Sequence, residues 1–331
     1  MISQHDTINY SQTESKAKFI LMESLNSVLS ARQFTPEHLK QLLKSALRIE
    51  EELKTKKTLN LLQGTILSAL FFEPSTRTRL SFESAMHRLG GSVITSVGMQ
   101  FSSLAKGESL FDTLKMIEAY ADVCAIRHPT EGASALAAKN ISIPVINAGD
   151  GAGEHPTQAL LDLYTIEKIH SIQKKPVKIA FIGDNLHGRT VHSLLWLLKH
   201  YDVSVVTINP EALQLPDKYK QLLAESNINL LNSENLTDVK DCDVLYVTRI
   251  QEERFLDHHE YEKHKDSYSI NRDFIVNQCK ESTIVMHPLP RLSEVNIDLD
   301  NHPSAVYFQQ AKNGLYTRMA LILYLLGYDF A

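Results

Sequence analysis

Residues Phe71–Arg79 read FFEPSTRTR, and this stretch says more about the fold than any other part of the chain. An apolar run from Thr65 to Phe72 leads into it and is typical of a buried strand. The amphipathic pattern of residues 81–89 follows it and is typical of a helix. The polar residues between them are therefore expected at a strand-to-helix turn, the repeating junction of an α/β fold.

The same turn carries groups that suit a phosphate. Hydroxyls and a guanidinium converge on it from Ser75, Thr76, Arg77 and Thr78. The backbone N–H groups of a helix start, the positive end of its dipole and a fixed cation all favour a bound phosphate. Ser and Thr are also common helix caps, and a first-turn Arg is often only solvated. The complete nine-residue string is more specific than a cap and favours the phosphate site.

Strands and helices alternate along the chain in two series, separated by the polar connector of residues 171–176. Nearly continuous apolar strands in such a series indicate parallel sheets covered by helices on both faces. We therefore expect an α/β fold with two doubly wound parallel-sheet domains joined by helices. The expected helices cover residues 35–54, 81–89, 110–121, 156–169, 189–199 and 314–326, and the expected strands cover residues 66–72, 123–126, 145–146, 177–182, 203–208, 244–248 and 283–286.

These patterns also predict domain boundaries. Residues 1–16 are rich in polar side chains and are expected to form a loose tail. Residues 17–155 would form the first domain and residues 156–311 the second. The strongly apolar C-terminal segment, residues 312–331, must pack on other elements, and we expect its helix to pack back on the first domain and complete it.

Composition narrows the class of protein. The 331 residues are 43% hydrophobic and 22% charged, which is typical of a globular protein with room for two domains. A net charge of −5 gives no overall basic field for nucleic acid or an anionic membrane. The polar residues 1–18 lack the apolar core of a secretory signal, and three cysteines without close pairing fit a reducing compartment, so a cytoplasmic protein is expected.

Several polar groups follow apolar strands directly. Arg127 follows residues 123–126, Arg249 follows residues 244–248, and the string HPLPR begins at His287. Open parallel sheets bind ligands outside the carboxyl ends of their strands. One such Arg is often a surface charge, but several at equivalent positions indicate a shared cleft.

Two further helix starts carry candidate groups. His155 and Gln158 lie three residues apart at the start of the helix that begins with Pro156, so they can share one face. Either a helix cap or a pair of groups aimed at a carbonyl and its amino group fits this spacing. The loop Gly183–Arg189 lacks the G-x-G-x-x-G spacing of a dinucleotide site, which argues against a nicotinamide oxidoreductase. Arg189 can instead hold a carboxylate with two parallel hydrogen bonds.

No metal or organic cofactor is expected. His258, His259 and His264 match no strong pattern of metal ligands and lie in a highly charged segment. No Ser-His-Asp or Cys-His arrangement is evident in the sequence, so we expect no covalent enzyme intermediate.

Taken together, these strings resemble the aspartate/ornithine carbamoyltransferase family, from about Ser30 to the C-terminus. The resemblance implies that the 71–79 turn and the groups near it bind carbamoyl phosphate, through Ser75, Thr76, Arg77, Thr78, Arg127, His155, Gln158, Pro288 and Leu289. Thr78, Arg127 and His155 would contact the carbonyl oxygen and Gln158 the amino group. Arg189, Arg249 and Gln251 match positions that hold L-aspartate in this family.

The resemblance also implies an assembly. Lys106, with Ser102 or Ser103, matches a loop that reaches into the active site of a neighbouring subunit, so a homotrimer with shared sites is expected. Lys106 would then act in catalysis and touch both substrates. Glu73 and the region of Arg254 resemble positions that bridge the domains on closure. A regulatory chain or a dihydroorotase partner is a further option that the sequence leaves open.

The resemblance implies transfer of a carbamoyl group from carbamoyl phosphate to L-aspartate, a step of pyrimidine biosynthesis in the family. Ornithine carbamoyltransferases share the first signature, but they carry Cys where this chain has Pro288, and no convincing Ser-Met-Gly motif is present. Arg189 and Arg249 suit a dicarboxylate acceptor. Two alternatives to transfer onto L-aspartate stay open: a carbamoyltransferase with another amine acceptor such as ornithine, and a non-catalytic paralogue that binds anions.

Overall fold

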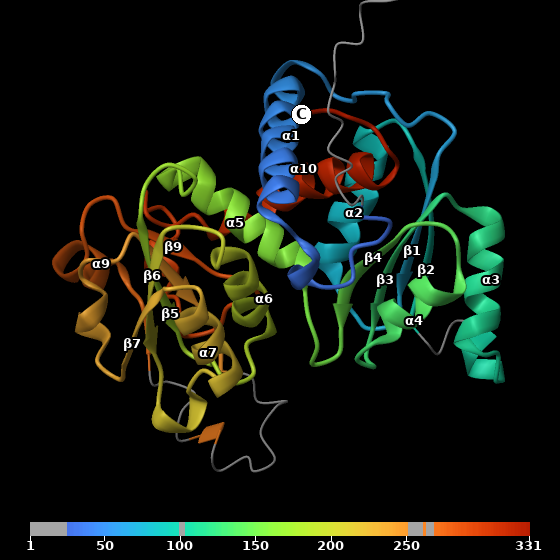
Figure 1. Cartoon of the computed structure of the whole chain (residues 1–331). Coiled ribbons are helices and arrows are strands. Elements are labelled where there is room, and N and C mark those ends of the chain that lie inside the picture. The colour runs from blue at the N-terminus through green and yellow to red at the C-terminus, as the bar shows by residue number, and fades with distance from the viewer. Residues whose placement is uncertain (1–24, 99–102, 251–260, 263–267) are drawn as a thin grey trace, which may run out of the picture.

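The computed structural model describes residues 25–98, 103–250, 261–262 and 268–331. The described residues form two separate parallel sheets, each flanked by helices. The two sheets lie on opposite sides of a group of central helices (Figure 1). The expected α/β fold with two parallel-sheet domains is confirmed. In the described residues, no helix has the length and apolar character needed to cross a membrane.

The first sheet has the strand order β2 (Ser92–Val97), β1 (Ile66–Phe71), β3 (Val123–His128), β4 (Val145–Asp150), and all its strands are parallel. The chain builds from β1 outward to β2 and then returns to the other side of β1 to form β3. The order therefore reverses between β1 and β3, and ligands of open α/β sheets bind at such a reversal. Its helices are α2 (Thr76–Arg88), α3 (Leu110–Tyr120) and α4 (Ala133–Asn140), with the short turn η3 (Ser103–Lys106).

The second sheet follows the same plan. Its parallel strands have the order β7 (Asn229–Ser233), β6 (Val203–Ile208), β5 (Val177–Ile182), β8 (Val244–Val247), β9 (Ile284–Met286), so the order reverses between β5 and β8. The helices of this half are α6 (Arg189–Leu198), α7 (Asp217–Glu225) and α9 (Arg272–Gln278), with the short turns η4 (Glu211–Leu213), η5 (Leu236–Val239) and η7 (Ile297–Leu299).

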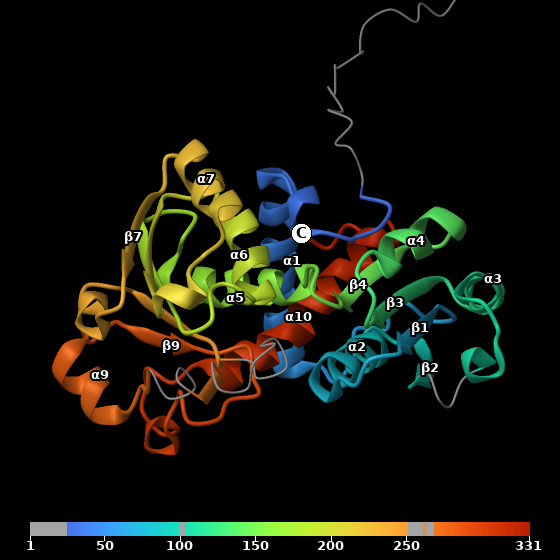
Figure 2. The same cartoon turned by 90° about the horizontal axis from the view of Figure 1, so that it is seen from below.

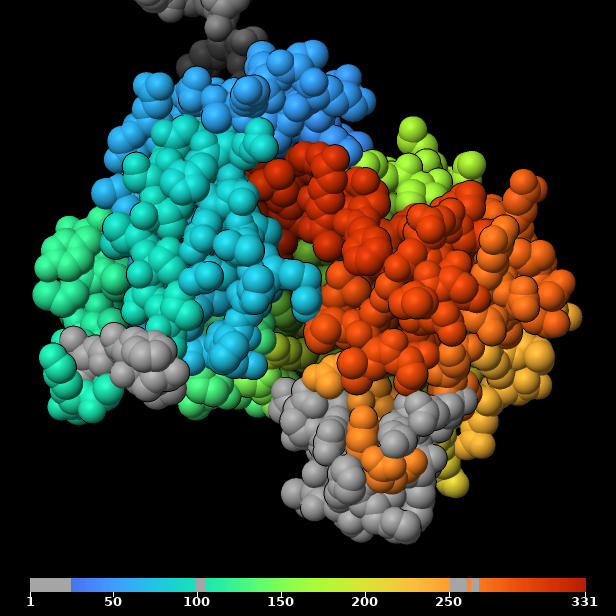
Figure 3. Space-filling view, turned by 180° about the vertical axis from the view of Figure 1, so that it is seen from behind, coloured from blue at the N-terminus to red at the C-terminus, as the bar shows by residue number. Residues whose placement is uncertain are grey.

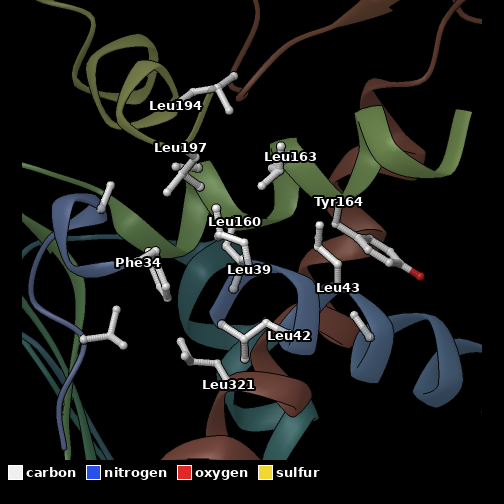
Figure 4. Packing of buried hydrophobic residues seen from close by; sticks show 14 of the residues in the cluster. Phe34, Leu39, Leu42, Leu43, Leu160, Leu163, Tyr164, Leu194, Leu197 and Leu321 are labelled. Atoms are coloured by element: carbon white, nitrogen blue, oxygen red, sulfur yellow. The ribbon is translucent and has the colours of Figure 1, made fainter. Parts of the chain in front are cut away.

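Three longer helices join the two halves: α1 (Pro36–Thr55), α5 (Pro156–His170) and α10 (Tyr307–Leu325). The helix α10 packs against α1, α2 and α5, so the C-terminal helix returns to the first domain as expected. Figure 2 shows α10 and α5 running between the two sheets. One continuous apolar core crosses this joint. In Figure 4, Leu160 and Leu163 of α5 lie between Leu194 and Leu197 of α6 and the leucines of α1.

The structure corrects several predicted boundaries. The helix α2 begins at Thr76 instead of residue 81, and α10 begins at Tyr307 instead of residue 314. The first turn of α2 is polar, and in α10 the aromatic pair Tyr307 and Phe308 is followed by mostly polar residues up to Asn313, so apolar periodicity did not reveal either start. Arg127 and His128 lie inside β3 and do not follow it.

The elements that the sequence analysis missed are β2, α4, α7, β7 and α9. The strands β2 and β7 are edge strands with largely exposed side chains, so they lack the apolar run of a central strand. The predicted domain boundaries and the tail of residues 1–16 stay predictions, since the tail lies outside the described residues.

The joint between the halves predicts that two leucines of α1 contribute very differently to the free energy of unfolding. Leu42 is buried in the shared core, whereas Leu47 on the same helix is 41% exposed. Leu42→Ala should lower the free energy of unfolding by about 2–5 kcal/mol, because the cavity cannot close completely. Leu47→Ala, the matched control, should change it by less than about 0.5 kcal/mol. Urea denaturation of both variants measures the difference, and equal effects would contradict this view of the joint.

Candidate active site

A cavity of about 490 Å³ lies at the carboxyl ends of strands from both sheets. In Figure 3 a hollow separates the cyan atoms of the first half from the red and orange atoms of the C-terminal part. Most of the predicted site residues line the cavity, namely Ser75, Thr76, Arg77, Thr78, Arg127, His155, Gln158, Arg189, Arg249, Pro288 and Leu289. The two strand-order reversals therefore face one site.

The start of α2 forms one wall of the cavity. Ser75 is its N-cap residue in an extended conformation, and its side chain makes no capping hydrogen bond. The first N–H groups of a helix have no partner within the helix, and residues 75–78, at the start of α2, line the cavity. Partial burial and the nearby charge of Arg127 both lower the pKa of Arg77. This end of the cavity therefore combines N–H donors, hydroxyls and cations, which suit a phosphate.

Arg127 reaches the cavity from β3 and is only 8% exposed. Its Nη1 donates to the carbonyl oxygen of Ala148 at 3.3 Å, and its Nη2 pairs with Glu73 Oε1 at 3.1 Å. Gly149, with φ of +116°, makes space for it: a Cβ there would lie 2.8 Å from Arg127 Nη1 and 3.5 Å from Arg189 Nη2. The φ of +116° favours glycine, and the missing Cβ lets the Arg127 guanidinium lie close to the backbone.

His155 is the residue before Pro156 at the start of α5, and it is 5% exposed. Its backbone N–H donates to Ser193 Oγ at 3.0 Å, which ties it to α6 of the second half. Burial, followed by the charges of Arg189, Arg127 and Arg318, holds the pKa of His155 well below its usual value. The imidazole is therefore neutral at pH 7 and can donate a hydrogen bond without adding another cation.

The opposite wall comes from the second half. Arg189 is the first residue of α6, and its Nη1 donates to the carbonyl oxygen of Gly151 in the first half. Arg249 lies just beyond β8 and also lines the cavity. Together they place two guanidinium groups across from the start of α2, an arrangement that suits a ligand with carboxylates.

The Pro288–Leu289 turn is fixed by its neighbours. The N–H of Leu289, which has φ of +58°, donates to His287 Nδ1 at 2.8 Å. His287 Nε2 therefore carries the proton, and it donates to Glu294 Oε1 at 2.8 Å. The backbone of this turn is thus held against the cavity by a buried chain of hydrogen bonds.

Sequence reasoning missed Arg318 and Gln310, which line the cavity from α10. The guanidinium of Arg318 is buried, lies 5.1 Å from the centre of the Phe82 ring, and fits because Gly314 has no Cβ to meet it. Burial lowers its pKa to about 10, so it stays charged at neutral pH. A single Arg within an otherwise apolar helix was the signal that could have revealed it.

Some predicted residues are not in this cavity. Lys106 lies at the exposed end of η3 and does not line the cavity of its own chain. Ser102, Gln251, Arg254 and the histidines 258, 259 and 264 lie outside the described residues. Within the described residues, no group of three or more His, Cys, Asp or Glu side chains could hold a metal ion.

The electrostatics of the cavity favour anions. Five arginines line it, Arg77, Arg127, Arg189, Arg249 and Arg318, and among the described lining residues Glu73 is the only carboxylate. This concentration of cations in a chain of net charge −5 indicates a site for more than one anionic group.

The low pKa of His155 predicts its behaviour in acid. Since charging this imidazole is opposed by burial and by three arginines, it should stay neutral as the pH falls from 8 to 5.5. The measurement is an NMR titration of ¹³C-labelled histidines, with the His155 signal assigned by its loss in His155→Gln. Free histidine in the same buffer is the reference. A shift of the His155 signal with a midpoint near the usual value of about 6.5 would refute the neutral assignment.

Comparisons with known proteins agree with this geometry. Two family models match the chain: the carbamoyl-P binding domain of the aspartate/ornithine carbamoyltransferases over residues 26–168, and their Asp/Orn binding domain over residues 175–325. The chain is 51% identical over 307 residues to the aspartate carbamoyltransferase catalytic subunit of Leptospira biflexa, covering 93% of this chain and 98% of that protein. It is 48% identical over 301 residues to the catalytic subunit of Methanocaldococcus jannaschii, covering 90% and 97% of the two chains.

Solved structures give the same result. The catalytic subunit of M. jannaschii aspartate transcarbamoylase superposes with a TM-score of 0.85 at 48% identity, covering 91% of this chain and 98% of that one. The aspartate transcarbamoylase of Trypanosoma cruzi, in complex with carbamoyl phosphate and aspartate, superposes with a TM-score of 0.84 at 40% identity, covering 89% and 95%. The chain belongs to the aspartate/ornithine carbamoyltransferase family.

Proposed function

We propose that this enzyme transfers the carbamoyl group of carbamoyl phosphate to the amine of L-aspartate, giving N-carbamoyl-L-aspartate and phosphate. One observation carries the proposal: a helix start suited to phosphate faces Arg189 and Arg249 across a single cavity. Ornithine carries an ammonium side chain, which two guanidinium groups would repel, so the dicarboxylate is the better acceptor. The relatives with about half of their residues identical are aspartate carbamoyltransferases.

Binding of carbamoyl phosphate would use the start of α2. The phosphate would lie against the hydroxyls and N–H groups of residues 75–78, with Arg77 as its cation. Its carbonyl oxygen would point to Thr78, Arg127 and His155, and its amino group to Gln158. The neutral state of His155 leaves a ring N–H free to donate to that oxygen.

In the reaction, the unprotonated amine of aspartate attacks the carbonyl carbon. A C–N bond forms, negative charge develops on the oxygen, and the C–O bond to the phosphate then breaks. Donors placed at such an oxyanion are each worth about 3 kcal/mol. Among the described residues that line the cavity, none is assigned as a general base in this proposal, and the departing phosphate takes the proton from the amine nitrogen. Much of the rate would come from holding two anions together among the arginines.

The proposed contact of Arg127 with the carbonyl oxygen has to be reconciled with its ion pair to Glu73. In the proposed mechanism, Nη2 of Arg127 leaves the Glu73 carboxylate, 3.1 Å away, and turns to the carbonyl oxygen. We therefore include closure of the cleft in the mechanism, with Glu73 free to pair with a cation of the second half.

The site is completed by a neighbouring chain in this proposal. Lys106 is exposed and is the last residue of η3, and the helix α3 that follows it lies at the outer edge of the first half, far from the second sheet (Figure 1). The same end exposes large apolar side chains of α3 and β2, with exposed fractions of 48% for Phe111, 60% for Tyr120 and 39% for Val97. Such a surface suits contact with a second copy. A homotrimer would bring Lys106 of one chain to the phosphate of the next. The enzyme would act in cytoplasmic pyrimidine biosynthesis.

An acceptor panel tests the reaction. With carbamoyl phosphate, purified protein should carbamoylate L-aspartate at least about 10²-fold faster than ornithine, N-acetylornithine or putrescine. These three amines lack the second carboxylate of aspartate, so in their complexes the arginines of the acceptor site would lack a partner. Colorimetric detection of the ureido product measures each rate, and omission of the acceptor is the control. Faster carbamoylation of ornithine would refute the proposed acceptor, and no product with any amine would favour a non-catalytic paralogue.

Mixed trimers test the sharing of sites. Arg77→Ala and Lys106→Ala should each reduce turnover at least about 10²-fold, since each removes a cation from the phosphate. After equal mixing with exchange of chains, about a quarter of the sites should combine an intact Arg77 with an intact Lys106 and regain activity. Each variant, dissociated and reassembled alone, is the control. If the mixture is no more active than its parents, sites are not shared between chains.

A further inference from the structure

A buried carboxylate lies directly behind the cavity wall. Asp162 of α5 has no exposed surface and does not line the cavity. Its Oδ1 accepts hydrogen bonds from Gln158 Nε2 at 2.9 Å and from Gln310 Nε2 at 2.6 Å, and its Oδ2 accepts one from the Tyr246 hydroxyl at 2.7 Å. The partners come from α5, α10 and β8, and both glutamines line the cavity.

This network determines which way each glutamine amide points. An amide group has one donor nitrogen and one acceptor oxygen, and a carboxylate oxygen selects the nitrogen. The Oε1 of Gln310 accepts the backbone N–H of His287 at 2.8 Å, so its Nε2 must face Asp162. Oδ1 of Asp162 is therefore an acceptor, and Gln158 must present the same nitrogen to it. The Oε1 of Gln158 is then left as the acceptor for a ligand.

The charge of Asp162 does not alter this conclusion. Burial raises the pKa of Asp162 to about 7, and the hydrogen bonds from Gln310, Tyr246 and Gln158, followed by the charge of Arg318, oppose that rise. A proton on the carboxyl would lie on Oδ2, because the Tyr246 hydroxyl can turn and accept it, whereas the two amide nitrogens can only donate. Oδ1 accepts in both states, so the network needs an acceptor at this position more than it needs a negative charge.

We infer that Asp162 is a positioning residue which turns the carbonyl oxygen of Gln158 toward the amino group of carbamoyl phosphate. The inference rests on the proposed function, since it assigns Asp162 a role at the same site. Through Gln158 it would select a carbamoyl group over an acyl group of similar shape, because only the carbamoyl group has N–H donors.

The test compares the affinity for carbamoyl phosphate with that for acetyl phosphate, in which a methyl group replaces the amino group. In Asp162→Leu the acceptor is lost and Gln158 can turn its amide. The preference for carbamoyl phosphate over acetyl phosphate should fall about tenfold, which corresponds to the loss of one hydrogen bond. Dissociation constants of both ligands, from equilibrium binding, give the preference.

Two matched variants separate positioning from general damage to the fold. Asp162→Asn keeps an oxygen at the position of Oδ1 and should keep the preference of the wild type within about threefold. Tyr246→Phe removes only the hydroxyl at Oδ2 and should keep it as well. A structural defect would weaken the binding of both phosphates equally and leave their ratio unchanged.

The outcomes are distinct. An unchanged ratio in folded Asp162→Leu would overturn the inference, and so would an Asp162→Asn variant that loses the preference. If Asp162→Leu does not fold, Asp162→Ala takes its place, because it also removes the acceptor for Gln158 Nε2, and the same fall in the preference is expected. If the wild type forms no N-carbamoyl-aspartate, the proposed function fails. If the wild type is active but Asp162→Leu leaves the ratio unchanged, only the role of Asp162 is rejected.

Discussion

The packing of α5 against α1, α6 and α10 is the contact on which the rest of the structure depends. In each sheet the strand order reverses at one point, where open α/β sheets bind ligands at the carboxyl ends of the strands. Neither sheet alone carries all the groups that line the cavity. The apolar core shared by these helices holds the two edges face to face. It also places His155 and Gln158, at the first turn of α5, between the two halves. A hydrophobic joint thus determines the geometry of a polar site.

The cavity concentrates positive charge in a chain that is acidic overall. Clustered guanidinium groups are unfavourable by themselves, because like charges repel at short range and partial burial removes their solvent. The structure limits this cost in two ways: Glu73 pairs with Arg127, and His155 remains neutral. Bound anions would replace Glu73 as partners of the arginines. The same electrostatics therefore account for the resting arrangement and for the affinity that the proposed reaction requires.

Much of the fold and of the site could be predicted from local patterns. Residues 66–71 form a central strand that is almost completely buried, so the apolar run predicted over residues 66–72 identifies it. The edge strands β2 and β7 have largely exposed side chains and give no such run, which is why they were missed. Arg318 and Asp162 were missed for a different reason. Their roles depend on contacts with residues far apart in sequence, such as Phe82 and Tyr246.

The sequence by itself determined the chemistry of each ligand-facing segment, because the start of α2, the His155 turn and Arg189 are local arrangements of neighbouring residues. It also determined that two α/β domains would form, since apolar strands and amphipathic helices alternate in two series. Only the tertiary structure decided how these segments meet. The pairing of Arg127 with Glu73, the neutral state of His155 and the amide orientation set by Asp162 all arise from burial and long-range contacts, which no local pattern encodes.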